Sequence, residues 1–183
     1  GSTTINITGG NAGTAGTASA TTGGTAGAAG GTATVTMTGA TSSANIALDN
    51  GTANGAIAGG IATIAFNAAH VLTGDITAAA DGEGAITVAT GTLTINGSVG
   101  TATNEVNTLV ASQAVTTNNN LYIEDIDLTA AVALTLNGTT AKTVSGALYS
   151  TSTGGVTTGA NSNWTFNGAV GTTSAGVTQA MDA

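Results

Sequence analysis

Along most of the chain, apolar side chains alternate with threonine, serine or asparagine, a period of two residues that is typical of half-buried β-strands. The first segment has one face formed by Thr3, Ile5 and Ile7 and the other by Thr4, Asn6 and Thr8. Further candidate strands are residues 34–38, 45–49, 56–66, 71–77, 85–90, 92–96, 106–112, 121–128, 131–137, 140–149, 164–167 and 176–181. No stretch shows a sustained helical stripe of apolar residues, so the pattern predicts an all-β fold.

Asn-Gly pairs punctuate these segments and favour tight hairpin turns, because both residues tolerate positive φ, although the corners of a solenoid would use the same pair. They begin at Asn50, Asn54, Asn96, Asn137 and Asn167. The segment Thr94–Thr101 is echoed by Thr165–Thr172 and, in shorter form, by Thr135–Gly138, at unequal offsets. Recurrent hairpin chemistry with irregular spacing favours a β-sandwich or jelly-roll-like subunit. A parallel β-helix with loops of varying length is the alternative.

Three segments of different composition divide the chain. Residues 1–8 form a predicted N-terminal strand arm, and residues 32–183 form a predicted all-β domain. Residues 9–31 consist of glycine, alanine, threonine and serine, with Asn11 as the only other residue. We expect this stretch to act as a linker. It is either a flexible tether or a tightly packed region that only small side chains can enter.

Composition and charge exclude several partner classes. Glycine, alanine and threonine make up more than half of the 183 residues, so few large side chains are available for a core. Nine acidic residues face one base, Lys142, and the formal net charge is −8. Nucleic acids and anionic membranes both require clustered basic residues, so neither is an expected partner. No apolar run approaches the roughly 18 residues of a membrane-spanning helix.

Catalytic side chains are scarce. His70 is the only imidazole and lies between apolar neighbours, where a structural role is the favoured interpretation. The chain has no cysteine, and aromatic residues that could stack against a sugar substrate are few. The sequence therefore predicts a protein that is not an enzyme.

Calcium binding is the best-supported candidate chemistry. If residues 121–128 form a strand, Asp125 and Asp127 share one face about 7 Å apart along it. Hard carboxylate oxygens suit Ca²⁺, so these two residues are the candidate metal ligands, and no other cofactor is predicted. Glu124 belongs to the same acidic cluster, and Asp81-Gly82-Glu83 is a second, turn-like possibility. The alternative is a solvated strand face, with Glu124 near Lys142.

The segments Thr92–Gly100 and Thr165–Gly171 resemble the passenger regions of bacterial surface-antigen autotransporters of the rickettsial type. They are also similar in texture to S-layer and other secreted surface proteins. The resemblance implies export, an elongated β fold, and a structural or adhesive role outside the cell or at its surface.

A terminal strand followed by a small-residue stretch is the arrangement required to donate that strand to a neighbouring copy. We expect Thr3–Thr8 to link subunits head to tail, because such an interface propagates into an open homopolymer. The predicted function is a structural subunit of a self-assembling extracellular filament or surface layer. One alternative is an adhesin-like passenger that binds surface ligands. A less favoured one is an ice-binding β-solenoid, suggested by the threonine pairs in 34–38 and 92–94.

Overall fold

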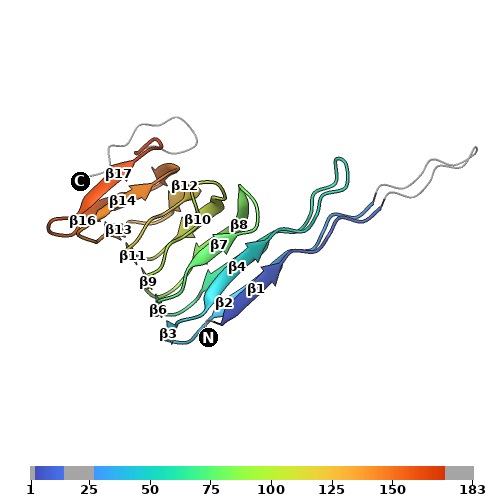
Figure 1. The fold of residues 1–183 in the computed structure, drawn as a ribbon, viewed down its shortest axis with the longest axis horizontal. Coiled ribbons are helices and arrows are strands. Elements are labelled where there is room, and N and C mark those ends of the chain that lie inside the picture. Colours follow the sequence, from blue (N-terminus) through green and yellow to red (C-terminus); the bar gives the residue numbers. More distant parts are fainter. Residues whose placement is uncertain (1–2, 15–26, 172–183) are drawn as a thin grey trace, which may run out of the picture.

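The computed structural model describes residues 3–14 and 27–171, and within them every helix or strand assigned is a β-strand. The chain passes through three sheets in turn, and each strand pairs in parallel with the strand in the same sheet one pass later. This topology fits a parallel β-helix (Figure 1). We call each pass a coil and the three sheets faces 1, 2 and 3.

Face 1 contains β1 (Thr4–Thr8), β4 (Asn45–Asp49), β7 (Ile76–Ala78), β14 (Ala141–Val144) and β17 (Asn163–Phe166). Between β7 and β14, isolated parallel bridges through Val99 and Leu121 continue this face. Face 2 contains β2 (Ala33–Met37), β5 (Ala62–Phe66), β8 (Glu83–Val88), β10 (Val106–Ala111), β12 (Ile123–Leu128) and β15 (Ala147–Ser150). Face 3 contains β3 (Thr41–Ser42), β6 (His70–Leu72), β9 (Leu93–Ile95), β11 (Val115–Thr117), β13 (Ala133–Leu136) and β16 (Gly155–Thr158).

The all-β prediction is confirmed, but the β-sandwich or jelly-roll expectation is corrected. Hairpins would make neighbouring strands antiparallel, whereas every pair of named strands in the described residues is parallel. Antiparallel β-bridges in the same residues are limited to Asn54–Ile57 and Thr101–Asn104. A period of two says which side of a strand is buried, and it does not say which strand is its neighbour.

Most Asn-Gly pairs lie at corners between faces instead of in hairpin turns. Gly97 and Gly168 do not have positive φ, yet a Cβ on either would overlap a carbonyl oxygen of the preceding coil. Those oxygens belong to Gly74 and Gly146, respectively. The hairpin role holds at Gly55, where φ is 61° and the Asn54–Ile57 bridge closes a loop tip. The same dipeptide therefore serves two physical purposes in this chain.

The core is a stack of aliphatic side chains that runs through the interior of the β-helix. Alternation is regular on face 2, where β8 has every second residue fully buried. The described rows of buried residues include Ile46, Ile76, Val99, Leu121 and Val144 on face 1, and Ile64, Ile86, Leu109, Ile126 and Leu148 on face 2. Each coil thus contributes a few large side chains, and stacking the coils joins them into one core.

Several candidate strands coincide with observed ones, and β4 occupies the predicted residues 45–49. The candidate segment 140–149 is divided at a corner into β14 and β15, and β5 is shorter than the predicted 56–66. The short strands β3, β11 and β16 were not predicted, and the candidate 176–181 lies outside the described residues. Face changes every few residues explain these differences, because they interrupt the period of two.

Two insertions project together from the corner between faces 1 and 2 (Figure 1). One follows β1 and includes residues 9–14 and 27–31, and the other is residues 50–61 between β4 and β5. The amide of Gly10 donates to Gly31 O at 2.7 Å, and the amide of Gly51 donates to Gly60 O at 2.8 Å. We call the paired glycine-rich segments 9–13, 27–31, 51–52 and 58–60 the glycine stem. The described ends of the predicted linker are therefore packed, and residues 15–26 lie outside the described part.

Candidate functional site

The predicted linking strand lies in the first coil of its own chain. β1 pairs in parallel with β4 along its whole length, from Thr4 opposite Asn45 to Thr8 opposite Asp49. The carbonyl of Thr3 extends this ladder by accepting the Asn45 amide at 2.9 Å. Ile7 points into the core, and Ile5 is half-buried against it.

The outer edge of the first coil is open in the described part of the protein. β1, β2 and β3 each end their sheet and have one described partner strand. On β2, the Ala33 amide donates to Ile61 O and the Met37 carbonyl accepts from the Asn67 amide, so these groups face β5. Since backbone groups alternate along a strand, the amides of Thr34 and Thr36 face the open edge. The apolar Ile5, Ala33, Val35 and Met37 cap the core at this end and are only partly buried.

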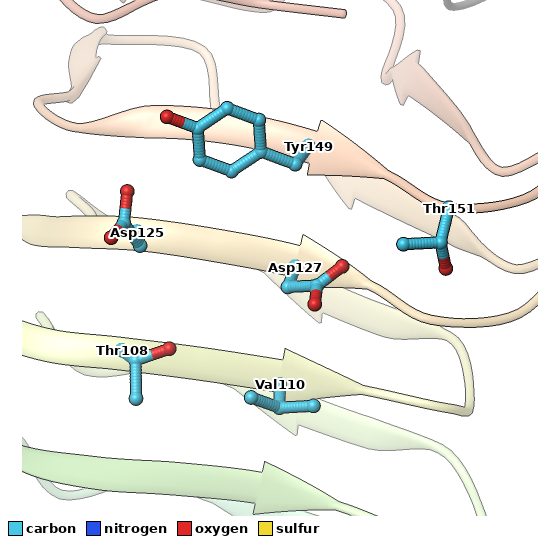
Figure 2. Close-up of a pocket in the computed structure, with 6 residues that line it drawn as sticks. All are labelled: Thr108, Val110, Asp125, Asp127, Tyr149 and Thr151. Carbon is cyan, nitrogen blue, oxygen red and sulfur yellow. The ribbon is translucent and has the colours of Figure 1, made fainter. Parts of the chain in front are cut away.

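A hollow lies on the outer side of face 2, near the end of the β-helix opposite the first coil (Figure 2). Its lining residues are Thr108 and Val110 of β10, Asp125 and Asp127 of β12, Tyr149 of β15, and Thr151 directly after it. Both candidate metal ligands therefore line the same hollow. The parallel register places Asp127 between Val110 and Tyr149 in one transverse row.

The carboxylates of the hollow differ in their surroundings. Asp125 is exposed, whereas Asp127 is half-buried and its Oδ1 atom is buried without a hydrogen-bond partner. In the described residues, no group of three or more His, Cys, Asp or Glu side chains is placed to hold a metal ion. The Ca²⁺ assignment of Asp125 and Asp127 therefore stays a prediction with two candidate ligands.

Glu124 is the second residue of β12, and its carboxylate lies near Gly82 of the second acidic segment. Asn107 Nδ2 donates to Glu124 Oε2 at 3.2 Å, and Asp81 Oδ1 accepts the amide of Glu105 at 3.0 Å. Burial raises the pKa of Glu124, and the negative charges of Asp81, Glu105 and Asp125 raise it further. The fold thus brings together two acidic segments that are far apart in sequence. We call Asp81, Glu105 and Glu124 the acidic corner. A backbone amide donates to Asp81, and the side-chain amide of Asn107 donates to Glu124.

Lys142 takes a different partner from the one considered in the sequence. Its Nζ donates to Asn119 Oδ1 at 3.2 Å. The next residue along the chain, Asn120, accepts the amide of Thr143 at its Oδ1 atom at 2.9 Å.

His70 lies inside the coil at the start of β6. It is 2% exposed, and its Nδ1 lies 2.5 Å from the carbonyl oxygen of Gly39. Its ring contacts that of Phe66 at a centroid distance of 5.2 Å, and Nε2 is buried without a partner. The His70 ring is therefore packed in the interior of the β-helix.

The strand register also determines how threonines are aligned on the outer side of face 3. One residue from each of four coils forms a single outward rank, consisting of Thr94, Thr116, Thr135 and Thr157. The next outward rank includes Asn118, which donates to Asn96 Oδ1 at 2.6 Å. On the described part of face 3, the threonine rank is therefore flanked by an asparagine-containing rank.

Sequence reasoning did not predict Tyr149 or its neighbours as part of a site. Tyr149 is 22 residues from Asp127, and only the pairing of β15 with β12 brings the two side by side. Coil lengths vary along the chain, so no fixed spacing in the sequence indicates this pairing.

No protein-family model, curated protein or solved structure matches this chain. Among the residues that the structure describes, there is no helix long and apolar enough to cross a membrane.

Proposed function

We propose that the chain is a structural, non-catalytic subunit that associates with copies of itself into an extracellular filament or surface layer. The observation that carries this proposal is the open first coil, where three strands end their sheets and half-buried apolar residues cap the core. Unpaired strand edges gain backbone hydrogen bonds when a further strand is added. A second copy can supply that strand and cover the exposed apolar surface.

The geometry favours addition of a coil in parallel register. In the described residues, the strands of successive coils already pair in parallel within each face. A further copy continues that pattern. Because the contact joins one end of a copy to a different surface of the next, it does not close on itself and propagates. Exchange of Thr3–Thr8 between copies is a second form of the same contact, in which the β1–β4 pairing is made between chains.

A proline substitution at the open edge tests the proposal. Thr36→Pro removes an amide that faces the open edge and leaves the Ala33 and Met37 bonds to the neighbouring coil in place. Thr36→Ala keeps the amide and is the matched control. We expect the parent and Thr36→Ala to form particles that grow with concentration, and Thr36→Pro to stay monomeric, in sedimentation velocity and negative-stain electron microscopy.

Met37→Lys is a second variant, which places a charge at the half-buried end of the core without changing the backbone. It should also give folded monomers. Assembly of both variants to the parent's extent, or a parent that stays monomeric at every concentration, would contradict the proposal.

A second candidate function is a non-polymerising module that binds ligands at a cell surface. One observation favours it, the hollow on face 2 with its two carboxylates and its tyrosine. Assembly does not need this hollow, since the open first coil lies at the opposite end of face 2.

A further inference from the structure

We propose that the hollow over β10, β12 and β15 is a binding site for a neutral oligosaccharide. This inference deepens the second candidate function and is independent of self-assembly. The hollow has a volume of about 220 Å³, which is below the roughly 300–1,000 Å³ of sites that enclose a drug-sized ligand, so a ligand here lies partly outside it along the surface of face 2.

Parallel pairing determines how the lining groups are spaced. Neighbouring strands are about 4.8 Å apart, so Val110, Asp127 and Tyr149 form a transverse row roughly 10 Å long. Along β12, Asp125 and Asp127 are about 7 Å apart. The lining therefore presents an apolar side chain, two carboxylates and one aromatic ring over an area comparable to one or two sugar rings (Figure 2).

Asp127 supplies a hydrogen-bond acceptor that the protein itself leaves unused. Its Oδ1 atom is buried and has no partner, although the residue lines an open hollow. A buried oxygen without a donor destabilises the folded protein, and a ligand donor that reaches it recovers that free energy. An ionised carboxylate only accepts hydrogen bonds, so its ligand must bring donors, and sugar hydroxyls are donors.

Tyr149 supplies the apolar surface that a sugar ring requires. It is half-buried and lies in the row of Asp127, on the next strand. Its ring offers a flat apolar face, and its hydroxyl can both donate and accept. Thr108 and Thr151 add hydroxyls at the rim of the hollow. An aromatic platform beside carboxylate acceptors suits a ligand with apolar C–H faces and many hydroxyl groups.

Charge and ligand number argue against the other small-ligand classes. Two carboxylates in a protein of formal net charge −8 repel phosphorylated, sulfated or uronic-acid ligands. In the described part of the chain, no group of three or more acidic, cysteine or imidazole side chains is placed to hold a metal ion, which disfavours a bare divalent cation. A neutral saccharide needs neither a counter-charge nor further ligands.

The test is a binding screen on monomeric protein, such as Thr36→Pro, so that failure of the assembly proposal does not affect it. The probes are neutral hexasaccharides of β-1,4-glucose, β-1,4-xylose, β-1,4-mannose and α-1,4-glucose, followed by saturation-transfer NMR and calorimetry up to about 10 mM. Oligogalacturonate, CaCl₂ and a tri-lysine peptide are run in parallel.

We expect at least one neutral hexasaccharide to bind and the three charged probes not to compete with it. Asp127→Asn and Tyr149→Ala should each weaken binding by about tenfold or more, because one removes a carboxylate acceptor and the other the stacking surface. Asp49→Asn and Tyr122→Ala are the matched controls, since neither residue lines the hollow, and both should bind like the parent.

Three outcomes would overturn the proposal. The first is no binding of any neutral hexasaccharide. The second is binding that the Asp127 and Tyr149 variants leave unchanged. The third is preferential binding of Ca²⁺ or the lysine peptide that Asp127→Asn abolishes, which would assign the hollow to a cation.

Discussion

The amide of Gly60 donates a hydrogen bond to the carbonyl oxygen of Gly10 at 2.7 Å, although 50 residues separate them in the sequence. The amide of Gly10 in turn donates to Gly31 O within the same insertion. Gly10 therefore connects the two segments of its own insertion to each other and to the second insertion. A Cβ on Gly60 would overlap Gly31 O, and one on Gly30 would overlap Gly10 O. The glycine stem is thus held by close backbone contacts that a side chain at Gly30 or Gly60 would prevent.

The stem predicts a sharp contrast between adjacent glycines. Gly30→Ala should lower the free energy of unfolding by about 1–3 kcal/mol, because its Cβ meets fixed backbone atoms. Gly31→Ala is the matched control, since a Cβ there has no neighbour within 4 Å. Urea unfolding of the two variants measures the difference. Equal stabilities would show that the stem is not packed as described.

Core burial predicts large effects from small truncations. Leu109→Ala, in the middle of face 2, should destabilise the protein by about 2–5 kcal/mol through lost burial and a residual cavity. Thr87→Ala on the outer side of the neighbouring strand should change stability by less than about 0.5 kcal/mol. Thermal and urea denaturation provide the measurement. A small effect at Leu109 would contradict the stacked core.

The pKa of Glu124 predicts how stability changes with pH. Its folded pKa lies above the ordinary 4.5, so the folded state holds the proton more tightly than the unfolded state. The contribution of this group is therefore fully present below pH 4.5 and is lost as pH rises through the folded pKa. Glu124→Gln, whose amide oxygen can still accept from Asn107, should gain stability over the parent at pH 7 but not at pH 4.

Exposed Asp49, whose charge is not among those that raise the pKa of Glu124, provides the comparison. Asp49→Asn should show no such pH-dependent gain over the parent. If the free energy of unfolding differs between the parent and Glu124→Gln by the same amount at every pH from 4 to 7, the raised pKa of Glu124 does not influence stability as expected.

Metal removal should leave the fold unchanged. The described residues place only Asp125 and Asp127 together in the hollow, and no group of three ligands accompanies them. We expect the melting temperature to be the same with excess EDTA and with millimolar Ca²⁺ in calorimetric scans. A Ca²⁺-dependent rise that Asp127→Asn removes would instead establish the calcium site predicted from the sequence.

The candidate site shows where sequence reasoning stops. The period of two on β12 places Asp125 and Asp127 on the same side, and both do line one hollow. The third participant, Tyr149, belongs to the next coil, and the register that aligns it with Asp127 is a property of strand pairing. Likewise, Asn-Gly at Asn96 predicts a tight turn, and only the neighbouring coil shows that Gly97 closely approaches the carbonyl oxygen of Gly74.

By itself the amino-acid sequence determined that the described part of this protein is built of β-strands, and which side of most of those strands is buried. These properties depend on alternation and composition, which are local. The tertiary structure alone decided that the strands stack in parallel coils, that the small-residue segments pair into a stem, and that a tyrosine lines the same hollow as two carboxylates. Those outcomes depend on which backbone lies beside which, and that choice is made by burial and hydrogen bonding summed over the whole chain.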